Sequence, residues 1–167
     1  MRTKVMIVLS VIVLVAMNYG IYEKEQIKKH GETLLLELTP ADPRSLMQGD
    51  YMQFRYAIER NTPIQELAPH QKRGYMVISP DENNVAQFVR FHDKGKNLIS
   101  GEKLLYFRRQ YDIRIIPNSF FFQEGHAQHY QNAKYGLFKF DNSGNYLLVG
   151  LADQNRQEIV VKTSIAD

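Results

Sequence analysis

The chain contains no cysteine, and its net charge of +3 is small for 167 residues. The absence of cysteine excludes disulfide-bonded scaffolds, thiolate zinc sites and cysteine nucleophiles. The basic excess is confined to residues 1–30, because residues 31–167 contain 16 basic and 16 acidic side chains. Nucleic-acid-binding domains need a basic surface, so the charge distribution argues against a nucleic-acid partner. The sequence also lacks internal repeats and low-complexity tracts.

One uncharged apolar segment, residues 5–22, is interrupted only by Ser10, Asn18 and Gly20, and tyrosines lie near its end. A helix rises about 1.5 Å per residue, so this segment and its flanks nearly span the hydrocarbon core of a bilayer. In hydrocarbon the backbone must satisfy its hydrogen bonds internally, which favours a helix despite the many β-branched residues. We therefore predict a single transmembrane helix, with residues 1–30 forming the anchor and a polar extension that ends at Gly31.

Two other interpretations compete with an uncleaved anchor: a cleaved signal peptide and a buried helix of a soluble protein. Cleavage needs small residues at the −3 and −1 positions, and residues 14–20 offer no clear Ala-x-Ala pattern. Positive charge barely distinguishes the two orientations, because Arg2 and Lys4 precede the segment and three lysines follow it. A short tail before a single span usually leaves the following domain outside, so we expect a cytoplasmic N-terminus and a periplasmic domain.

From residue 33 onward apolar and polar residues alternate, the pattern of strands with one buried face. A helix is predicted over 123–133, which contain no β-branched residue. The sequence therefore predicts one mainly β domain over residues 31–167, barrel- or sandwich-like, with one helix in its second half. Strands are predicted at 34–38, 50–56, 74–79, 85–91, 103–108, 111–116, 135–140 and 146–150, and residues 157–164 could close the sheet.

The loop of residues 40–51, between the first two predicted strands, is dense in residues with backbone roles. Asp42 before Pro43 favours the start of a turn, and Gly49 can adopt a positive φ just before the strand. A loop of this kind is either a rigid connector or a binding surface held on a β scaffold.

Residues 49–56 read Gly-Asp-Tyr-Met-Gln-Phe-Arg-Tyr. This octapeptide resembles the motif after which the GDYXXLXY family of bacterial membrane-anchored proteins is named, with Phe54 where the name has leucine. The upstream segment 42–46 and the later Glu124-Gly125 pair are also similar to that family. The resemblance implies an anchor in the bacterial inner membrane, a small extracytoplasmic domain and a polytopic membrane protein as candidate partner. It implies no catalytic residue and no cofactor.

We predict that the protein is a non-catalytic interaction or accessory module of the cell envelope, which contacts the lipid bilayer through residues 5–22. A membrane partner would bind the 40–51 loop and its neighbours. The candidate binding residues are Asp42, Arg44, Gly49, Asp50, Tyr51 and Arg55. The alternative is a structural role for the motif, in which Met52, Phe54 and Tyr56 face the core and Asp50 fixes the turn.

Two further hypotheses concern chemistry. Ser45 could be the nucleophile of a serine–lysine peptidase similar to membrane signal peptidases, with a desolvated lysine as base, but the local pattern departs from that family. His126 and His129 would share one face of the predicted helix, with Glu124 just before them, as metal ligands do. No third ligand is identifiable. The three phenylalanines at 120–122 are interpreted as a buried strand end, or else as a patch facing a membrane or partner.

Overall fold

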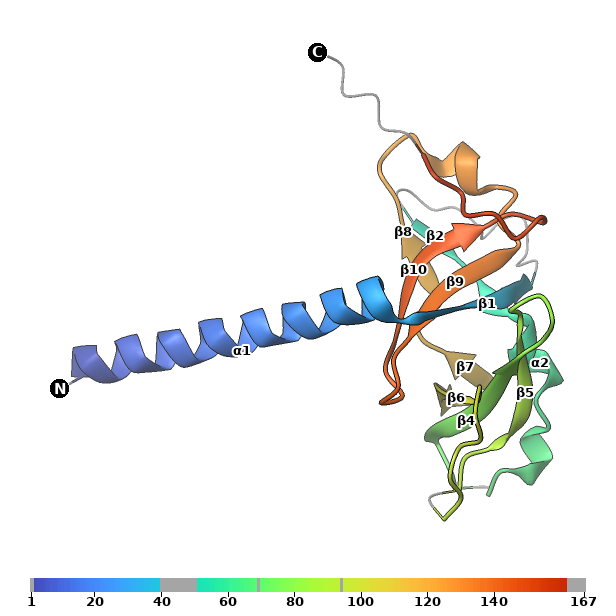
Figure 1. Ribbon diagram of the computed structural model, residues 1–167, viewed down its shortest axis with the longest axis horizontal. Helices are drawn as coiled ribbons and strands as arrows, with labels where there is room; N and C mark the ends of the chain where they lie inside the picture. Colours follow the sequence, from blue (N-terminus) through green and yellow to red (C-terminus); the bar gives the residue numbers. More distant parts are fainter. Residues whose placement is uncertain (1, 40–50, 69, 94, 162–167) are drawn as a thin grey trace.

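The computed structural model describes residues 2–39, 51–68, 70–93 and 95–161. A long helix extends as a rod away from a β-rich domain (Figure 1). The elements, with η marking 3₁₀ helices, are α1 (Arg2–His30), β1 (Glu32–Thr39), β2 (Tyr51–Gln53), β3 (Arg55–Tyr56), α2 (Ala57–Asn61), η1 (Ile64–Glu66), β4 (Arg73–Pro80), β5 (Ala86–Phe91), β6 (Lys103–Arg109), β7 (Ile113–Ile115), β8 (Ser119–Phe121), η2 (Ala127–Tyr130), β9 (Tyr135–Phe140) and β10 (Tyr146–Ala152).

The strands form three antiparallel sheets, in the orders β10-β9-β1-β3, β2-β8 and β5-β4-β6-β7. Alternate side chains of the two four-stranded sheets meet in one apolar cluster. Its members include Leu34, Leu36 and Leu38 of β1, Phe138 and Phe140 of β9, Met76 and Ile78 of β4, and Leu105 and Phe107 of β6. This confirms the predicted mainly β class, which was expected to be barrel- or sandwich-like.

Several turns are closed by the same local device, an aspartate that caps the backbone after it. Asp81, Asp141 and Asp153 each accept hydrogen bonds from the amides two and four residues later, at 2.8 to 3.0 Å. Asp and Asn favour such turns because their short side chains bond to nearby backbone. The hairpins predicted around residues 80–84 and 141–144 therefore form where the local sequence indicates.

The motif strand predicted over 50–56 is divided in two. β2 pairs with β8, whereas β3 pairs with β1, so the chain leaves one sheet at Phe54 and enters another. The predicted inward face is confirmed, because Met52, Phe54 and Tyr56 are all buried. The segment therefore joins two sheets at the core instead of extending a single strand.

The helix predicted over 123–133 is wrong in extent: the structure has only the single 3₁₀ helix η2 there. Gly125 adopts a φ of +82°, which an α-helix does not tolerate, and Tyr130 is the single buried residue of η2. Without an apolar stripe to bury, the segment gains little from becoming a longer helix. The sequence analysis also missed α2, and residues 157–161 form only a bridge between Glu158 and Ala152 where a strand was expected.

Helix α1 is long and apolar enough to cross a membrane. It has 29 residues, a mean hydropathy of 2.2 over its most apolar 18-residue stretch, and none of that stretch is buried against the rest of the chain. Its last turns, in contrast, are attached to the domain. This arrangement is consistent with single-pass membrane anchoring.

The junction between α1 and the domain is tightly packed. Ile27 is 2% exposed, and its carbonyl accepts the Gly31 amide at 2.8 Å. The Lys139 ammonium of β9 donates to the Gly31 carbonyl at 3.1 Å. A Cβ at Gly31 would lie 2.4 Å from the Ile27 oxygen, so only glycine allows the chain to pass from α1 into β1 this closely. The junction holds the domain at a fixed place on the helix.

Candidate functional site

The connection between β7 and β8 is held by side chains and backbone from the motif and from β10. Three consecutive carbonyls of residues 116–118 accept hydrogen bonds: Tyr146 Oη to Ile116 O (2.8 Å), Tyr56 Oη to Pro117 O (2.6 Å) and Phe54 N to Asn118 O (3.1 Å). The ring of Tyr56 packs edge-on against Phe54 and Phe138, with centroids 5.4 and 5.7 Å apart. Burial raises the pKa of Tyr56, with a smaller contribution from the Glu59 charge, so its hydroxyl stays a donor. This half of the motif supports the structural interpretation.

Two of the predicted binding residues lie on the surface side of the motif. Tyr51 of β2 is opposite Phe121 of β8, and their ring centroids are 5.6 Å apart. Phe121 is 74% exposed. Arg55 of β3 forms an ion pair with Asp112, at 3.6 Å. Tyr51 and Arg55 of the motif therefore contribute to an aromatic pair and to a charged pair with residues of other segments.

The other predicted residues cannot be compared with the structure. Asp42, Arg44, Gly49 and Asp50 lie outside the described residues, and so does Ser45. Their roles remain predictions. The peptidase hypothesis also required a lysine as base, and Lys103 is engaged in an ion pair with Glu32 at 2.8 Å.

A buried carboxyl near the motif escaped the sequence analysis. Glu59 of α2 is 5% exposed, and its Oε1 accepts the Ile115 amide at 2.9 Å. Its Oε2 has no hydrogen-bond partner among the described residues. Burial raises the pKa of Glu59, and the Ile115 amide, Arg114 and Arg55 partly oppose this shift. A lone glutamate in a short polar segment gave no sequence signal, because its burial depends on a contact 56 residues away.

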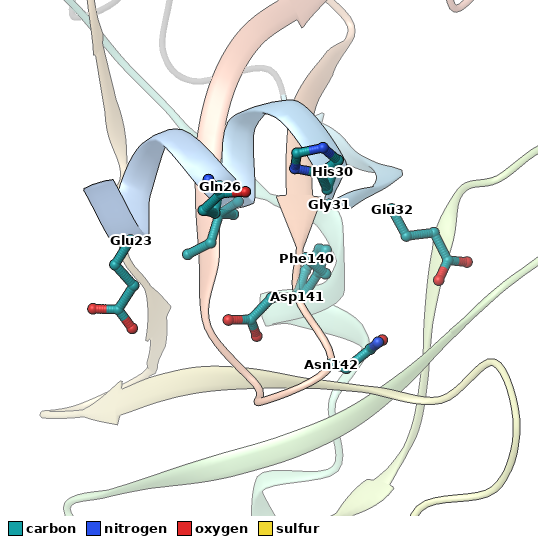
Figure 2. A pocket seen from close by; sticks show the side chains of 9 residues that line it. Glu23, Gln26, His30, Gly31, Glu32, Phe140, Asp141 and Asn142 are labelled. Carbon is teal, nitrogen blue, oxygen red and sulfur yellow. The ribbon is translucent and has the colours of Figure 1, made fainter. Parts of the chain in front are cut away.

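The base of α1 forms one wall of a pocket of about 410 Å³. Figure 2 shows Gln26 and His30 of α1 above Asp141 and Asn142 of the β9–β10 turn, with Glu23 of α1 to the left of Asp141. The acidic groups there are engaged in the fold. The carboxylate of Asp141 accepts the Asn145 side-chain amide at 3.0 Å and two backbone amides of its own turn at 2.8 Å. These bonds hold its pKa below the ordinary value although burial opposes them.

The two histidines of the metal hypothesis lie close together, with ring centroids 5.8 Å apart. No group of three His, Cys, Asp or Glu side chains able to hold a metal occurs among the described residues. Of the three phenylalanines at 120–122, two fit the interpretation as a buried strand end and one fits the interpretation as an exposed patch. Phe120 and Phe122 pack on Tyr130, at 5.4 and 5.3 Å between ring centroids, whereas Phe121 faces outward.

A comparison with known protein families assigns most of the chain to one family. The family model described as GDYXXLXY protein matches residues 13–151. The chain belongs to the GDYXXLXY family. The match begins inside α1 and ends in β10, so the family's common region includes the helix–domain junction as well as the motif. No curated protein and no solved structure matches the chain.

Proposed function

We propose that this GDYXXLXY protein is a membrane-anchored interaction module of the bacterial cell envelope. In this proposal α1 crosses the inner membrane once with its N-terminus in the cytoplasm. The β domain then binds a polytopic membrane protein on the periplasmic side. The contact surface comprises the 40–51 loop together with Tyr51, Arg55 and Phe121.

The observation that carries this proposal is the packed junction between an unburied apolar helix and the domain. Because Ile27 is buried and Gly31 is bonded from both sides, the domain cannot move freely on a flexible tether. Its surface is held at a constant height above the bilayer. Constant height is what a module needs to meet another membrane protein, since it removes much of the orientational cost of association.

The exposed aromatic pair supports the choice of surface. Tyr51 and Phe121 lie in contact at the edge of the two-stranded sheet, and the phenylalanine is largely exposed. Binding energy at protein interfaces is concentrated in aromatic and arginine side chains. Arg55 is the arginine of the same motif, and its partner Asp112 is exposed, so a bound protein could compete for it.

Crosslinking in intact cells tests the proposal, followed by detergent purification of the full chain and mass spectrometry of what accompanies it. We expect a stoichiometric membrane protein with the wild type and its loss in the Tyr51→Ala/Phe121→Ala variant. Ile99→Ala is the matched control, because Ile99 is an apolar residue that is 71% exposed and lies in the β5–β6 connection, outside the proposed surface. Recovery of the chain alone, or equal loss in the control, would contradict the proposed surface.

Orientation can be measured independently because the chain has no cysteine. A single cysteine at the exposed hairpin position, Glu82→Cys, should react with a membrane-impermeant maleimide in cells whose outer membrane is permeabilised. Thr3→Cys should react only after the inner membrane is opened. The reverse pattern would place the domain in the cytoplasm and refute the periplasmic assignment.

A further inference from the structure

Three arginines lie side by side on the outer face of the β5-β4-β6-β7 sheet. Arg73 of β4 is paired with Arg108 of β6, which is paired in turn with Arg114 of β7. Like charges directly opposite one another destabilise a sheet, so this row does not serve folding. Arg114 is close enough to the Glu59 carboxyl to lower its pKa. Arg73 and Arg108 form no ion pair with any acid in the described part of the chain.

A pocket of about 390 Å³ adjoins this row, between the sheet, the β9–β10 turn and the base of α1. Lys24 and Arg108 are the charged side chains among its described lining residues, and none of those is acidic. Tyr75 and Tyr106 line it as well, 5.4 Å apart between ring centroids. The Arg108 guanidinium lies 6.0 Å from the centroid of the Tyr106 ring. Two cationic side chains and three tyrosines, Tyr75, Tyr106 and Tyr146, therefore line a hollow of headgroup size.

The position of Lys24 fixes the depth of this pocket relative to the membrane. The apolar segment of α1 ends at Tyr22, and at about 1.5 Å per residue Lys24 lies roughly 3 Å beyond it. The headgroup layer of a bilayer is about 5 to 7 Å thick on each side. The pocket wall formed by Lys24 is therefore inside the headgroup layer. The rest of the pocket adjoins this wall, because its other lining residues belong to the domain that the junction at Ile27 holds against α1.

We propose that this pocket binds the phosphate of an anionic phospholipid headgroup from the leaflet that the domain faces. Guanidinium and ammonium groups are the usual protein ligands of phosphate, and tyrosines suit the boundary between headgroups and water. A lipid is favoured over a soluble phosphate because one wall of the pocket belongs to the helix that enters the bilayer. The inference uses the membrane-anchoring part of the proposed function but needs neither the partner nor the orientation.

The test uses the full chain in nanodiscs of phosphatidylcholine with increasing fractions of phosphatidylglycerol. Lipids retained after gentle release into a non-ionic detergent are counted by native mass spectrometry. The wild type should retain phosphatidylglycerol selectively. A hydrogen bond to a charged group contributes at least about ten-fold in affinity, so Lys24→Gln/Arg108→Gln should raise the fraction needed for half-occupancy by at least about ten-fold.

The matched control is Lys28→Gln/Arg60→Gln, which removes the same charges from exposed positions outside the pocket. An equal loss in this control would mean diffuse electrostatic attraction and would overturn the proposal. If the wild type retained phosphatidylcholine as well as phosphatidylglycerol, the proposal would also be overturned. Displacement of the bound lipid by an equal concentration of inorganic phosphate would overturn it too, because the site would then prefer a soluble anion. Far-UV circular dichroism establishes that each variant is folded. A chain that fails to enter nanodiscs refutes the anchor itself, whereas a chain that enters but retains no anionic lipid refutes only this site.

Discussion

Replacing Tyr56 by phenylalanine separates the structural role of the family motif from a functional one. The substitution removes one oxygen and leaves the ring in place against Phe54 and Phe138. The lost interaction is the hydrogen bond to the Pro117 carbonyl, at 2.6 Å. Tyr56 itself is 0% exposed, so water can reach the vacated position only from the side of the partly buried Pro117 carbonyl.

The expected cost follows from hydrogen-bond energetics. A hydrogen bond within a protein contributes about 0.5 to 1.5 kcal/mol net, and an acceptor left without a partner in the interior costs about 1 to 3 kcal/mol. Pro117 is only partly buried, so solvent can compensate in part. We therefore expect a loss of about 1 to 2 kcal/mol in the free energy of unfolding, which corresponds to a fall of roughly 3 to 8 °C in Tm for a domain of this size.

Thermal and urea unfolding of the full chain in nanodiscs, followed by circular dichroism in the strand region, measure this loss. The control is Tyr111→Phe, which removes an exposed hydroxyl and should leave stability unchanged within about 0.5 kcal/mol. If Tyr56→Phe unfolds like the wild type, the hydrogen bond to Pro117 does not stabilise the fold. The hydroxyl would then have to be explained by binding, and the structural interpretation of this half of the motif would fail.

The remaining predictions concern the buried glutamate and the junction. Because burial raises the pKa of Glu59 above 4.5, the native state binds its proton more tightly, and this group costs stability at neutral pH that is regained as pH falls towards 4.5. Glu59→Gln keeps an acceptor for the Ile115 amide and should therefore be at least as stable as the wild type at pH 7. The difference between their urea midpoints should shrink as the pH is lowered. A variant that is less stable than the wild type at pH 7 would contradict this prediction. Ile27→Ala should destabilise the junction by about 2 kcal/mol or more and should speed hydrogen exchange of the Gly31 amide. Val15→Ala, at a position that is 63% exposed, should change neither. Unchanged exchange at Gly31 in Ile27→Ala would mean that Ile27 does not hold the domain.

The features that the sequence predicts well are those that local patterns determine. The apolar run of α1 is a property of consecutive residues, and its identification needs no knowledge of the rest of the chain. The hairpins at Asp81 and Asp141 are likewise local, because each aspartate bonds to amides within four residues. The inward face of the motif follows from alternation alone.

The features that were missed depend on partners far along the chain. Alternation is the same whether a strand stays in one sheet or crosses to another, so the division at Phe54 left no trace in the pattern. The arginine row required the register of three strands, and single arginines at 73, 108 and 114 gave no signal. Over 123–133, the absence of β-branched residues favoured a helix. Gly125 with its positive φ and the lack of an apolar stripe leave only the short η2 there. Propensity is a weak guide when the segment has nothing to bury.

The motif and the basic pocket are physically connected, although they lie at different positions in the sequence. Ile116 and Pro117 line the pocket, and the same two residues are held by the hydroxyls of Tyr146 and Tyr56. Whatever binds in the pocket therefore contacts a wall whose position is determined by the last tyrosine of the motif. A segment fixed through consecutive carbonyls has little freedom to adjust, and a rigid wall preserves the spacing of the cations opposite it. The structural and functional interpretations of this tyrosine are thus compatible: it acts on the surface by holding the backbone beneath it.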